Sequence, residues 1–286
     1  MFNKPLQQVI GVGSGQTATL RLQPENLTLL GVQFKLSGTT FDKTHLTSIK
    51  VKVGAKTIWD VTYSQINRIN NYKNGADNAA VLLLDFTERD QALFPLKEAG
   101  ALDLMALIAV GEVYIELKIA GDAIAPVIDA VGFFSRSQGN PWVLKYVPFN
   151  WTTNAAGKFT LPLQFRGSVL KRVWIDYAGA DWAAGVDGNI NRLEIKKNSA
   201  VIYDQTCRDA RFMQSQFKKV PQSKMFVADF ILDNNHDAHI LTVRQVDTQG
   251  GKQLIYDAFE FNSFVTAAGG DAVTVIAEVL DSVTNL

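Results

Sequence analysis

Two stretches of this 286-residue chain carry the same pattern: LRLQPENLTLLGVQFKLSG (Leu20–Gly38) and LPLQFRGSVLKRVWIDYAG (Leu161–Gly179). Aligned with a shift of 141, they share six identical residues of nineteen, where chance gives roughly one or two. The shift then becomes 144, which aligns IKVKVGAKTIWD (Ile49–Asp60) with LEIKKNSAVIYD (Leu193–Asp204), and Asp85-Phe86 with Asp229-Phe230. This ordered recurrence predicts two similar domains in tandem.

Strand signals dominate both halves. Short runs rich in Val, Ile, Phe and Tyr alternate with Gly, Asn and Pro turns. The strands expected from this pattern are 17–22, 29–36, 48–53, 80–86, 112–119, 158–164, 169–177, 192–196, 225–232, 240–246, 258–264 and 272–279. Helical periodicity is confined to 64–72, its repeat partner 208–217, and a stretch around 87–99. The pattern predicts an all-β fold: two tandem eight-stranded antiparallel jelly-roll sandwiches with a few short helices in loops.

The length suits two domains of ordinary size. Three prolines and the Gly-Asn-Pro turn between residues 121 and 148 place the expected junction at 121–140. The first jelly roll, with an N-terminal arm at Met1–Gly15, then covers residues 1–121, and the second, with the linker, covers 122–286. Beyond Phe86 the repeat register is lost. The expected match of the strand at 112–119 is the final strand at 272–279, which needs a shift of about 160 and longer loops in the second domain.

Composition excludes several classes of protein. The 28 basic and 28 acidic residues cancel, which argues against a surface built to neutralise phosphate and therefore against a specific nucleic-acid partner. The single cysteine, Cys207, has no partner for an internal disulfide and is expected to be a partly buried structural thiol. No signal-peptide core and no apolar run long enough to span a bilayer are present, so we expect a soluble product made inside the cell.

Two motifs invite a ligand-binding interpretation, and each has a simpler one. The glycine-rich Gly11–Gly15 precedes a strand rather than a helix, so we expect a turn and no phosphate loop or other cofactor site. Asp233, Asp237 and His239 lie in one polar stretch and are weak candidates for metal ligands. Their spacing matches neither a zinc helix nor a calcium loop, which favours a polar loop between two strands.

Catalysis is not expected. No G-x-S-x-G elbow is present. A glycosidase needs two carboxylates that face each other. The candidate pairs are Asp60 with Asp204 and Asp85 with Asp229. Because each pair occupies equivalent positions in the two repeats, we expect these residues to serve the fold, for example by closing a turn or by capping the helix that follows.

Aromatic residues gather in PWVLKYVPFNW, at Trp142, Tyr146, Phe149 and Trp151. Such a cluster serves as a sugar-stacking platform, as the seal between two domains, or as an interface between subunits, and the last two are favoured. Phe2 and Leu6 in the N-terminal arm are further interface candidates, since an arm with no core to join is expected at a subunit contact.

The order of these motifs resembles a known family. FKLSGTTFDKTHLTSIKVKVGAKTIWDVTYSQINRINNY (Phe34–Tyr72) is similar to the first-domain core of the major capsid proteins of corticovirus-type, membrane-containing icosahedral bacteriophages. PWVLKYVPFNWTTNAAGKFTLP (Pro141–Pro162) resembles the entry into that family's second domain, and GGDAVTVIAEVLDSV (Gly269–Val283) resembles its closing strand. The resemblance covers most of the chain and lies in order and spacing, with few identities.

The resemblance implies a structural virion protein made in the host cytoplasm: a double jelly roll, not an enzyme. It implies a homotrimer whose six sandwiches form a pseudo-hexameric capsomer of an icosahedral shell over an internal lipid membrane. Neighbouring capsomers, vertex proteins, minor capsid proteins and the membrane are the implied partners. Some members hold divalent cations such as calcium at interfaces, but no ligand set here carries that over residue by residue. The alternative is a two-domain β-sandwich protein that binds or acts on glycans.

Overall fold

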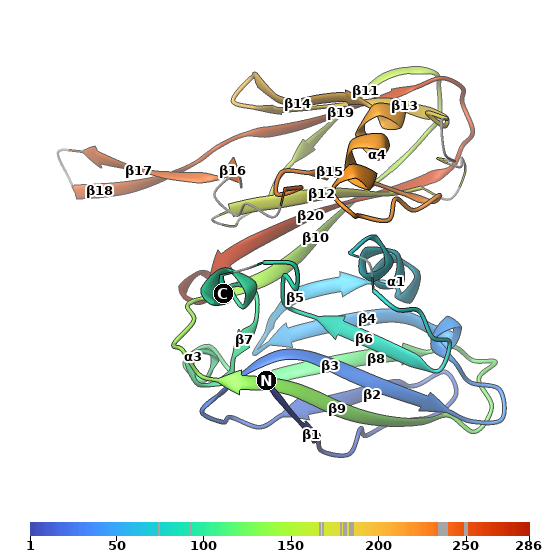
Figure 1. Cartoon of the computed structure of the whole chain (residues 1–286), viewed down its shortest axis with the longest axis vertical. Coiled ribbons are helices and arrows are strands. Elements are labelled where there is room, and N and C mark those ends of the chain that lie inside the picture. The colour runs from blue at the N-terminus through green and yellow to red at the C-terminus, as the bar shows by residue number, and fades with distance from the viewer. Residues whose placement is uncertain are drawn as a thin grey trace. The chain divides into compact units, whose positions relative to one another are not determined.

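The computed structural model of the chain describes residues 1–73, 75–91, 93–165, 167, 169–177, 179, 182, 186–233, 240–248 and 251–286. The chain divides into two compact units (Figure 1). The first comprises Met1–Asn71, Gly75–Tyr146 and Leu280–Leu286, and the second comprises Val147–Val279 together with Tyr72 and Lys73. The division therefore falls within two long strands, β10 (Trp142–Thr152) and β20 (Ala272–Ser282).

Two antiparallel sheets build the first unit (Figure 1). One has the order β1-β9-β3-β6, with a short β7 paired to β3; the other has the order β2-β8-β4-β5. Their bounds are β1 Phe2–Pro5, β2 Thr17–Leu22, β3 Leu27–Ser37, β4 Leu46–Val53, β5 Lys56–Val61, β6 Val81–Asp85, β7 Leu102–Asp103, β8 Val113–Ile119 and β9 Val127–Arg136.

The second unit repeats this arrangement. One sheet has the order β10-β20-β12-β15, with a short β16 paired to β12; the other has the order β11-β19-β13-β14. A separate two-stranded hairpin joins β17 to β18. The remaining bounds are β11 Gly157–Leu163, β12 Val169–Tyr177, β13 Ile190–Lys197, β14 Ala200–Thr206, β15 Met225–Asp229, β16 Ile240–Leu241, β17 Val243–Thr248, β18 Gly251–Tyr256 and β19 Phe259–Val265.

Both units are jelly rolls of eight main strands. In each, the first, eighth, third and sixth main strands in chain order form one sheet, and the second, seventh, fourth and fifth form the other. Alternating side chains create the sandwich: Leu20 and Leu22 of β2 are buried, whereas Arg21 between them is exposed. The same alternation in the second unit buries Leu193 and Ile195 of β13. The predicted double jelly roll is confirmed.

Helices are few and short. They are α1 (Tyr63–Tyr72), α2 (Phe94–Lys97), α3 (Leu104–Leu107) and α4 (Cys207–Gln216), with 3₁₀ turns η1 (Lys43–His45) and η3 (Val283–Asn285). α1 and α4 match the helices predicted from periodicity, and both follow the fifth main strand of their unit. The stretch around 87–99 holds a single short helix, α2, among its described residues. None of the described helices is long and apolar enough to cross a membrane.

Strand pairing confirms the repeat registers read from the sequence. Gly31 of β3 lies opposite Asp85 of β6, and Arg172 of β12 lies opposite Asp229 of β15. The two members of each pair are therefore related by the predicted shifts, 141 for 31 to 172 and 144 for 85 to 229. The repeat is structural as well as sequential.

The predicted match for the seventh strand is wrong. Val113 of β8 pairs with Leu22, and Phe259 of β19 pairs with Leu163. Because residues 22 and 163 correspond, 113 corresponds to 259, which is a shift of 146 rather than about 160. The final strand, β20, instead occupies the place of β9. β9 is not among the strands expected from the sequence, because it lies between Pro126 and Pro141 in the stretch interpreted as the linker.

The predicted domain boundary moves for the same reason. β9 lies in the expected junction at 121–140, yet it pairs with β1 and β3 of the first unit. A junction there would remove a central strand from a sheet. The second unit therefore begins after Tyr146 and not at residue 122.

The N-terminal arm is partly a strand of the core sandwich. β1 pairs with β9 along Phe2–Pro5, and the backbone N–H of Leu6 donates to the carbonyl of Ala130 at 2.9 Å. The Phe2 ring stacks on Phe134 with centroids 5.9 Å apart. The expectation of an arm with no core to join is thus wrong, because this segment is the edge strand of a sheet. The Gly11–Gly15 stretch is a turn, with Gly11 and Gly15 at positive φ.

Candidate interaction surfaces

The metal-ligand candidates divide between the described and undescribed parts of the chain. Asp233 is described, whereas Asp237 and His239 lie outside the described residues. Within the ranges that the structure describes, no group of three or more His, Cys, Asp or Glu side chains is placed to hold a metal ion.

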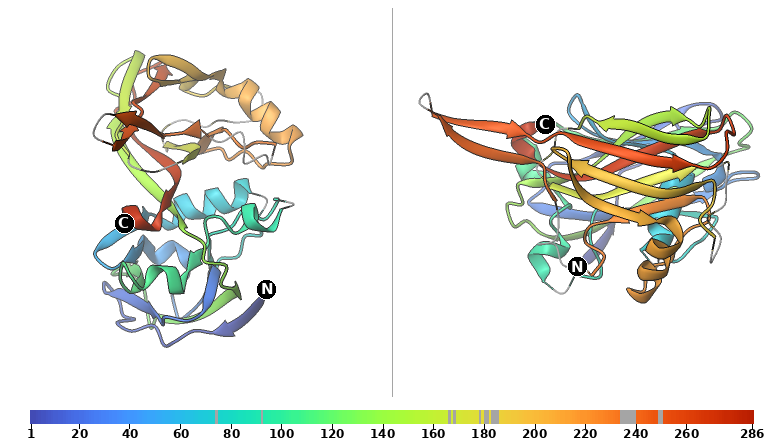
Figure 2. Two further views of the ribbon diagram at one scale, coloured as in Figure 1. Left: turned by 90° about the vertical axis from the view of Figure 1, so that its left-hand side faces the viewer. Right: turned by 90° about the horizontal axis from the view of Figure 1, so that it is seen from above.

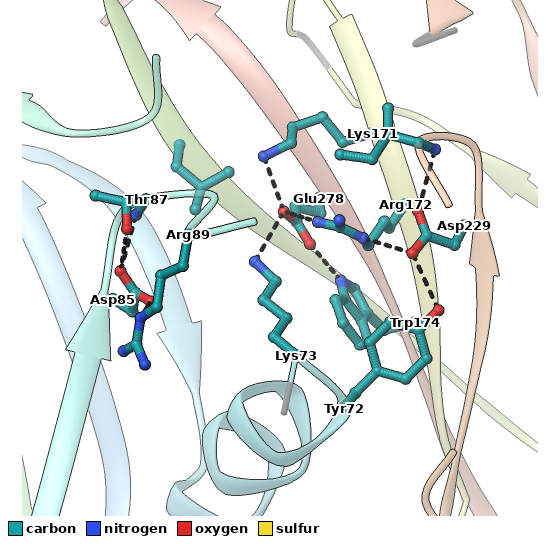
Figure 3. Close-up of polar contacts among 12 residues, drawn as sticks. Tyr72, Lys73, Asp85, Thr87, Arg89, Lys171, Arg172, Trp174, Asp229 and Glu278 are labelled. Atoms are coloured by element: carbon teal, nitrogen blue, oxygen red, sulfur yellow. Dashed lines mark hydrogen bonds and ion pairs between the residues drawn. The ribbon is translucent and has the colours of Figure 1, made fainter. Parts of the chain in front are cut away.

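Asp85 and Asp229 close equivalent turns at the ends of β6 and β15. Asp85 Oδ1 accepts from the backbone N–H of Thr87 at 3.0 Å, and Asp229 Oδ1 accepts from that of Ile231 at 3.1 Å. Each carboxylate also meets an arginine: Arg89 lies 2.6 Å from Asp85 (Figure 3), while Arg172 lies 3.0 Å from Asp229. Their shared role is to shape the chain where an edge strand ends.

Asp60 and Asp204 form pairs across neighbouring strands. Asp60 of β5 lies 3.1 Å from Lys50 of β4, and Asp204 of β14 accepts two hydrogen bonds from Arg192 of β13, at 2.7 and 2.6 Å. The two carboxylates belong to different units, each with its own partner. They stabilise strand pairs rather than face one another as a catalytic couple.

A cluster of buried charges occupies the second unit (Figure 3). Glu278 Oε1 lies 3.0 Å from Arg172 Nη1, 3.3 Å from Lys171 Nζ and 3.6 Å from Lys73 Nζ. Its Oε2 accepts a 2.7 Å hydrogen bond from Trp174 Nε1. One carboxylate thus compensates several cations from β12 and from the segment after α1. We call this set, with Asp229 and Tyr72, the Glu278 cluster.

Tyr72 and Asp229 complete the Glu278 cluster. The Tyr72 hydroxyl donates to Asp229 Oδ2 at 3.0 Å, and its ring meets Trp174 edge-on with centroids 5.3 Å apart. Burial, and then the neighbouring Asp229 carboxylate, raise the pKa of Tyr72 well above its usual value. The phenol stays neutral at physiological pH, so it acts as a fixed donor rather than as an acid or base.

The four aromatic residues predicted at an interface differ in how much of their surface is exposed to solvent. Tyr146 is buried in the first unit, with its ring 4.7 Å from that of Trp59. Trp142 is half-buried on β10. Phe149 and Trp151 pack against the core of the second unit while keeping part of their surface exposed. Tyr146 is therefore closed to a second chain, and the other three retain an accessible edge.

The N-terminal candidates are both accessible to some degree. Phe2 is 48% exposed on the edge strand β1, and Leu6, just after it, is half-buried. An edge strand with an exposed aromatic residue is a surface to which another chain can add. The contact role of Phe2 and Leu6 stays a prediction.

A second apolar surface, missed in the sequence, lies on α4. Phe212 and Met213 of α4 are 63% and 42% exposed and Phe217, which follows the helix, is 39% exposed, whereas Cys207, Ala210 and Gln214 of the helix are buried. We call Phe212, Met213 and Phe217 the α4 patch. In the first repeat, the equivalent of Phe212 is Arg68 and the equivalent of Phe217 is Lys73. This change from basic to aromatic residues between the repeats is the sequence signal that could have indicated the surface.

The β17–β18 hairpin extends away from the rest of the second unit (Figure 2). Its apolar side chains Val246, Leu254, Ile255 and Tyr256 are all exposed. At its base, Asp257 lies 3.0 Å from Lys197 and accepts a 2.6 Å hydrogen bond from Asn198. A lone two-stranded ribbon is marginally stable in water, and these contacts connect the base of the hairpin to the end of β13.

A surface hollow of about 360 Å³ lies on the β11-β19-β13-β14 sheet. Phe264 lines it, with Lys158 and Arg192 each placed over the ring, 5.7 and 4.9 Å from its centroid. Lys158 pairs with Glu194 and Arg192 with Asp204. The aromatic face is thus already occupied by cations, which disfavours it as a sugar-stacking platform.

Comparison with known families identifies both units. Residues 3–135 match the model of the viral coat protein P2 N-terminal domain, and residues 143–283 match that of the viral coat protein P2 C-terminal domain. The chain belongs to the viral coat protein P2 family. It is therefore a structural protein of the virion capsid, as the sequence resemblance implied, and the family is not one of enzymes.

Solved structures agree on the fold. The major capsid protein P2 from bacteriophage PM2 is 16% identical, with a TM-score of 0.78 over 98% of this chain and 97% of that one. The STIV MCP gives a TM-score of 0.66 at 10% identity, over 98% and 96%. The PBCV-1 virus capsid gives 0.60 at 11%, over 98% and 92%. A search of curated protein sequences finds no match.

Proposed function

We propose that three copies of this coat protein associate into a pseudo-hexameric capsomer, and that capsomers tile an icosahedral shell. The observation that carries the proposal is the duplication itself: both units have the same eight-strand order and equivalent strand registers. Three copies supply six similar units, which is the number needed for a hexagonal tile. A closed ring of identical chains is the common form of homo-oligomer.

The surface residues support association rather than chemistry. Among the described residues, the α4 patch and the hairpin expose apolar side chains such as Phe212 and Tyr256, and apolar surface of this kind can be buried by association. The charged groups considered above are engaged in pairs within a unit. Coat proteins self-associate to form a capsid, and the exposed apolar surface can become buried between copies of this chain.

The remaining partners of the proposal come from the resemblance in sequence. They are neighbouring capsomers, vertex and minor capsid proteins, and an internal lipid membrane beneath the shell. Divalent cations such as calcium at interfaces stay a prediction without assigned ligands. Chelation with EDTA is expected to lower the thermal stability of assembled particles if such ions contribute, and to leave it unchanged if they do not.

Electron microscopy of the purified chain tests the capsomer. Class averages of the stained protein are expected to show rings of six similar lobes, because each copy contributes two sandwiches. As a control, particles purified from producing cells are expected to carry this chain as their dominant band. Averages showing isolated two-lobed particles at all concentrations would refute the capsomer proposal.

A further inference from the structure

Equivalent ends of the two sandwiches are filled by side chains of different size. In the second unit, Phe165 and Phe259 pack ring against ring, with centroids 5.2 Å apart. The repeat registers, with shifts of 141 and 146, place Pro24 and Val113 at these positions of the first unit. Both residues are smaller than phenylalanine, so the first unit lacks the two rings that fill this place in the second.

An apolar hollow marks this place in the first unit. Its volume is about 110 Å³, and its apolar lining comes from Leu22, Pro24, Leu104, Ile108 and Val113. Ile108 is 48% exposed, so apolar surface continues from the hollow to the outside of the unit. An engineered apolar cavity of about 150 Å³ binds benzene. The hollow therefore has room for one aliphatic side chain.

The segment that forms one wall of the hollow differs between the repeats. β7 and β16 are equivalent, because each pairs with the third main strand of its unit, β3 or β12. In the first unit, the chain after β7 forms α3, and Leu104 of this helix lines the hollow. In the second unit, the chain after β16 forms the β17–β18 hairpin instead, which extends away from the unit (Figure 2). The first unit thus has a hollow where the second has a projecting ribbon.

The hairpin carries side chains of the kind that the hollow can accept. Leu254 is 55% exposed and Tyr256 42%, and both lie on one face of the ribbon because they are two residues apart on β18. Among the described residues, β17 and β18 pair with each other and with no further strand, so each has an unpaired backbone edge. Unpaired edges are costly in lipid. This favours a protein surface over a membrane as the partner of the hairpin.

We propose that the β17–β18 hairpin of one copy docks on the first unit of a second copy, with Leu254 in the hollow beside α3. The proposal rests on the self-association of the proposed capsomer. Every copy carries both the hairpin and the hollow, and coat proteins self-associate. Because the two surfaces differ, the contact is head-to-tail, which is the type of contact that closes three copies into a ring. Leu254 is then the anchor of each contact.

Cross-linking tests the contact directly. A chain carrying Gln23→Cys at the rim of the hollow and Lys252→Cys on the hairpin face of Leu254 is treated with a short bismaleimide, while the buried Cys207 stays unreactive. We expect two-chain and three-chain products. The matched control, Gln23→Cys with Val201→Cys on β14, also places one cysteine at an exposed strand position of the second unit and is expected to give none.

Three results of the cross-linking would overturn the contact but not the capsomer. They are products confined to one chain, equal yields from the two cysteine pairs, and no product from a preparation that light scattering shows to be trimeric. An unaltered chain that stays monomeric at every concentration would instead refute the capsomer, and this contact with it.

Filling the hollow tests the energetics. Pro24→Phe gives the first unit the residue that the second has at Phe165, so the new ring occupies the hollow from within the chain. Pro24→Phe and Leu254→Ala are each expected to weaken subunit association roughly tenfold. The matched control Val201→Ala, at a residue 51% exposed, leaves association unchanged. Because Pro24→Phe and Leu254→Ala remove the same contact, the double variant is expected to associate no more weakly than either single variant.

Fully additive losses in the double variant, or trimers of both single variants as tight as that of the unaltered chain, would refute the docking of Leu254 in the hollow. Vesicles of anionic phospholipid test the other occupant. If the unaltered chain binds them and the Leu254→Ala chain keeps its trimer but does not, the hairpin contacts lipid and the proposal is wrong. If circular dichroism shows that Pro24→Phe fails to fold, Leu254→Ala and the cross-linking decide.

Discussion

Gln214 donates a hydrogen bond from Nε2 to the carbonyl oxygen of Val227, 2.7 Å away, and so fixes α4 to β15. Asn70 fixes α1 to β6 in the same way. Both β6 and β15 are edge strands of their main sheets. A buried carbonyl at a sheet edge needs a donor, and a helix amide provides one while covering the edge. Both repeats therefore contain this hydrogen bond from a helix amide to an edge strand, although the donor is Asn70 in the first and Gln214 in the second.

Replacing the Gln214 amide is expected to destabilise the second unit. Gln214→Leu leaves the Val227 carbonyl without its side-chain donor, and a buried unsatisfied group costs about 1–3 kcal/mol. Urea denaturation measures the loss, with Gln216→Leu on the exposed side of α4 as the control. Equal stability of the two variants would show that the amide does not hold the helix.

The Glu278 cluster predicts a larger effect. Glu278→Gln removes the carboxylate that compensates Arg172 and Lys171 in the interior, and breaking a buried ion pair costs about 3–5 kcal/mol. Thermal unfolding should show a clearly lower midpoint, while Glu260→Gln, on an exposed position of β19, should behave as the unaltered chain. An unchanged midpoint for Glu278→Gln contradicts the assigned compensation.

Asp103 predicts sensitivity to acid. Burial by itself raises the pKa of Asp103, but hydrogen bonds outweigh it and hold the pKa below its usual value; the donors are the Ser137 hydroxyl and the backbone N–H groups of Ala106, Asn140 and Gly139. Because the folded-state pKa is depressed, this stabilisation is complete above the unfolded pKa of about 4 and is lost as pH falls through the folded pKa.

The measurement for Asp103 is the free energy of unfolding between pH 6 and pH 3. The unaltered chain is expected to lose more stability over this interval than Asp103→Asn, which has no carboxylate to protonate. Parallel pH profiles for the two proteins would show that Asp103 contributes nothing to acid sensitivity.

Cys207 is expected to be inert in the folded chain. Its side chain is fully buried, its Sγ donates to the Ile190 carbonyl at 3.1 Å, and burial is the main reason that the pKa of the thiol is raised. A thiol reagent at pH 8 should label no cysteine in the native protein and one per chain in urea. Rapid labelling of the native protein would place Cys207 at the surface.

The repeat could be predicted because the residues that recur are apolar side chains at alternating, core-facing positions of the strands. Leu20 and Leu22 recur at Leu161 and Leu163, and Val32 recurs at Val173, each in a position fixed by strand geometry. Asp85 and Asp229, which were expected to serve the fold by closing a turn or capping a helix, each close a turn. Regular periodicity and turn chemistry are local properties, so a single sequence carries them.

Other features depend on partners far away in the chain. β1 is four residues long and ends in Pro5, so its strand character comes from pairing with β9. The Glu278 cluster joins Lys73, Arg172 and Glu278, which no local pattern connects. The exposure of Phe212 depends on which face of α4 meets the sandwich. Such relations arise from tertiary packing, which overrides local propensity.

The molar mass in solution tests the central claim most directly. Two equivalent jelly rolls in one coat-protein chain predict a trimer, so multi-angle light scattering should give three times the 31.5 kDa of the chain, independent of concentration. A monomer near 31.5 kDa that persists at every concentration would contradict it.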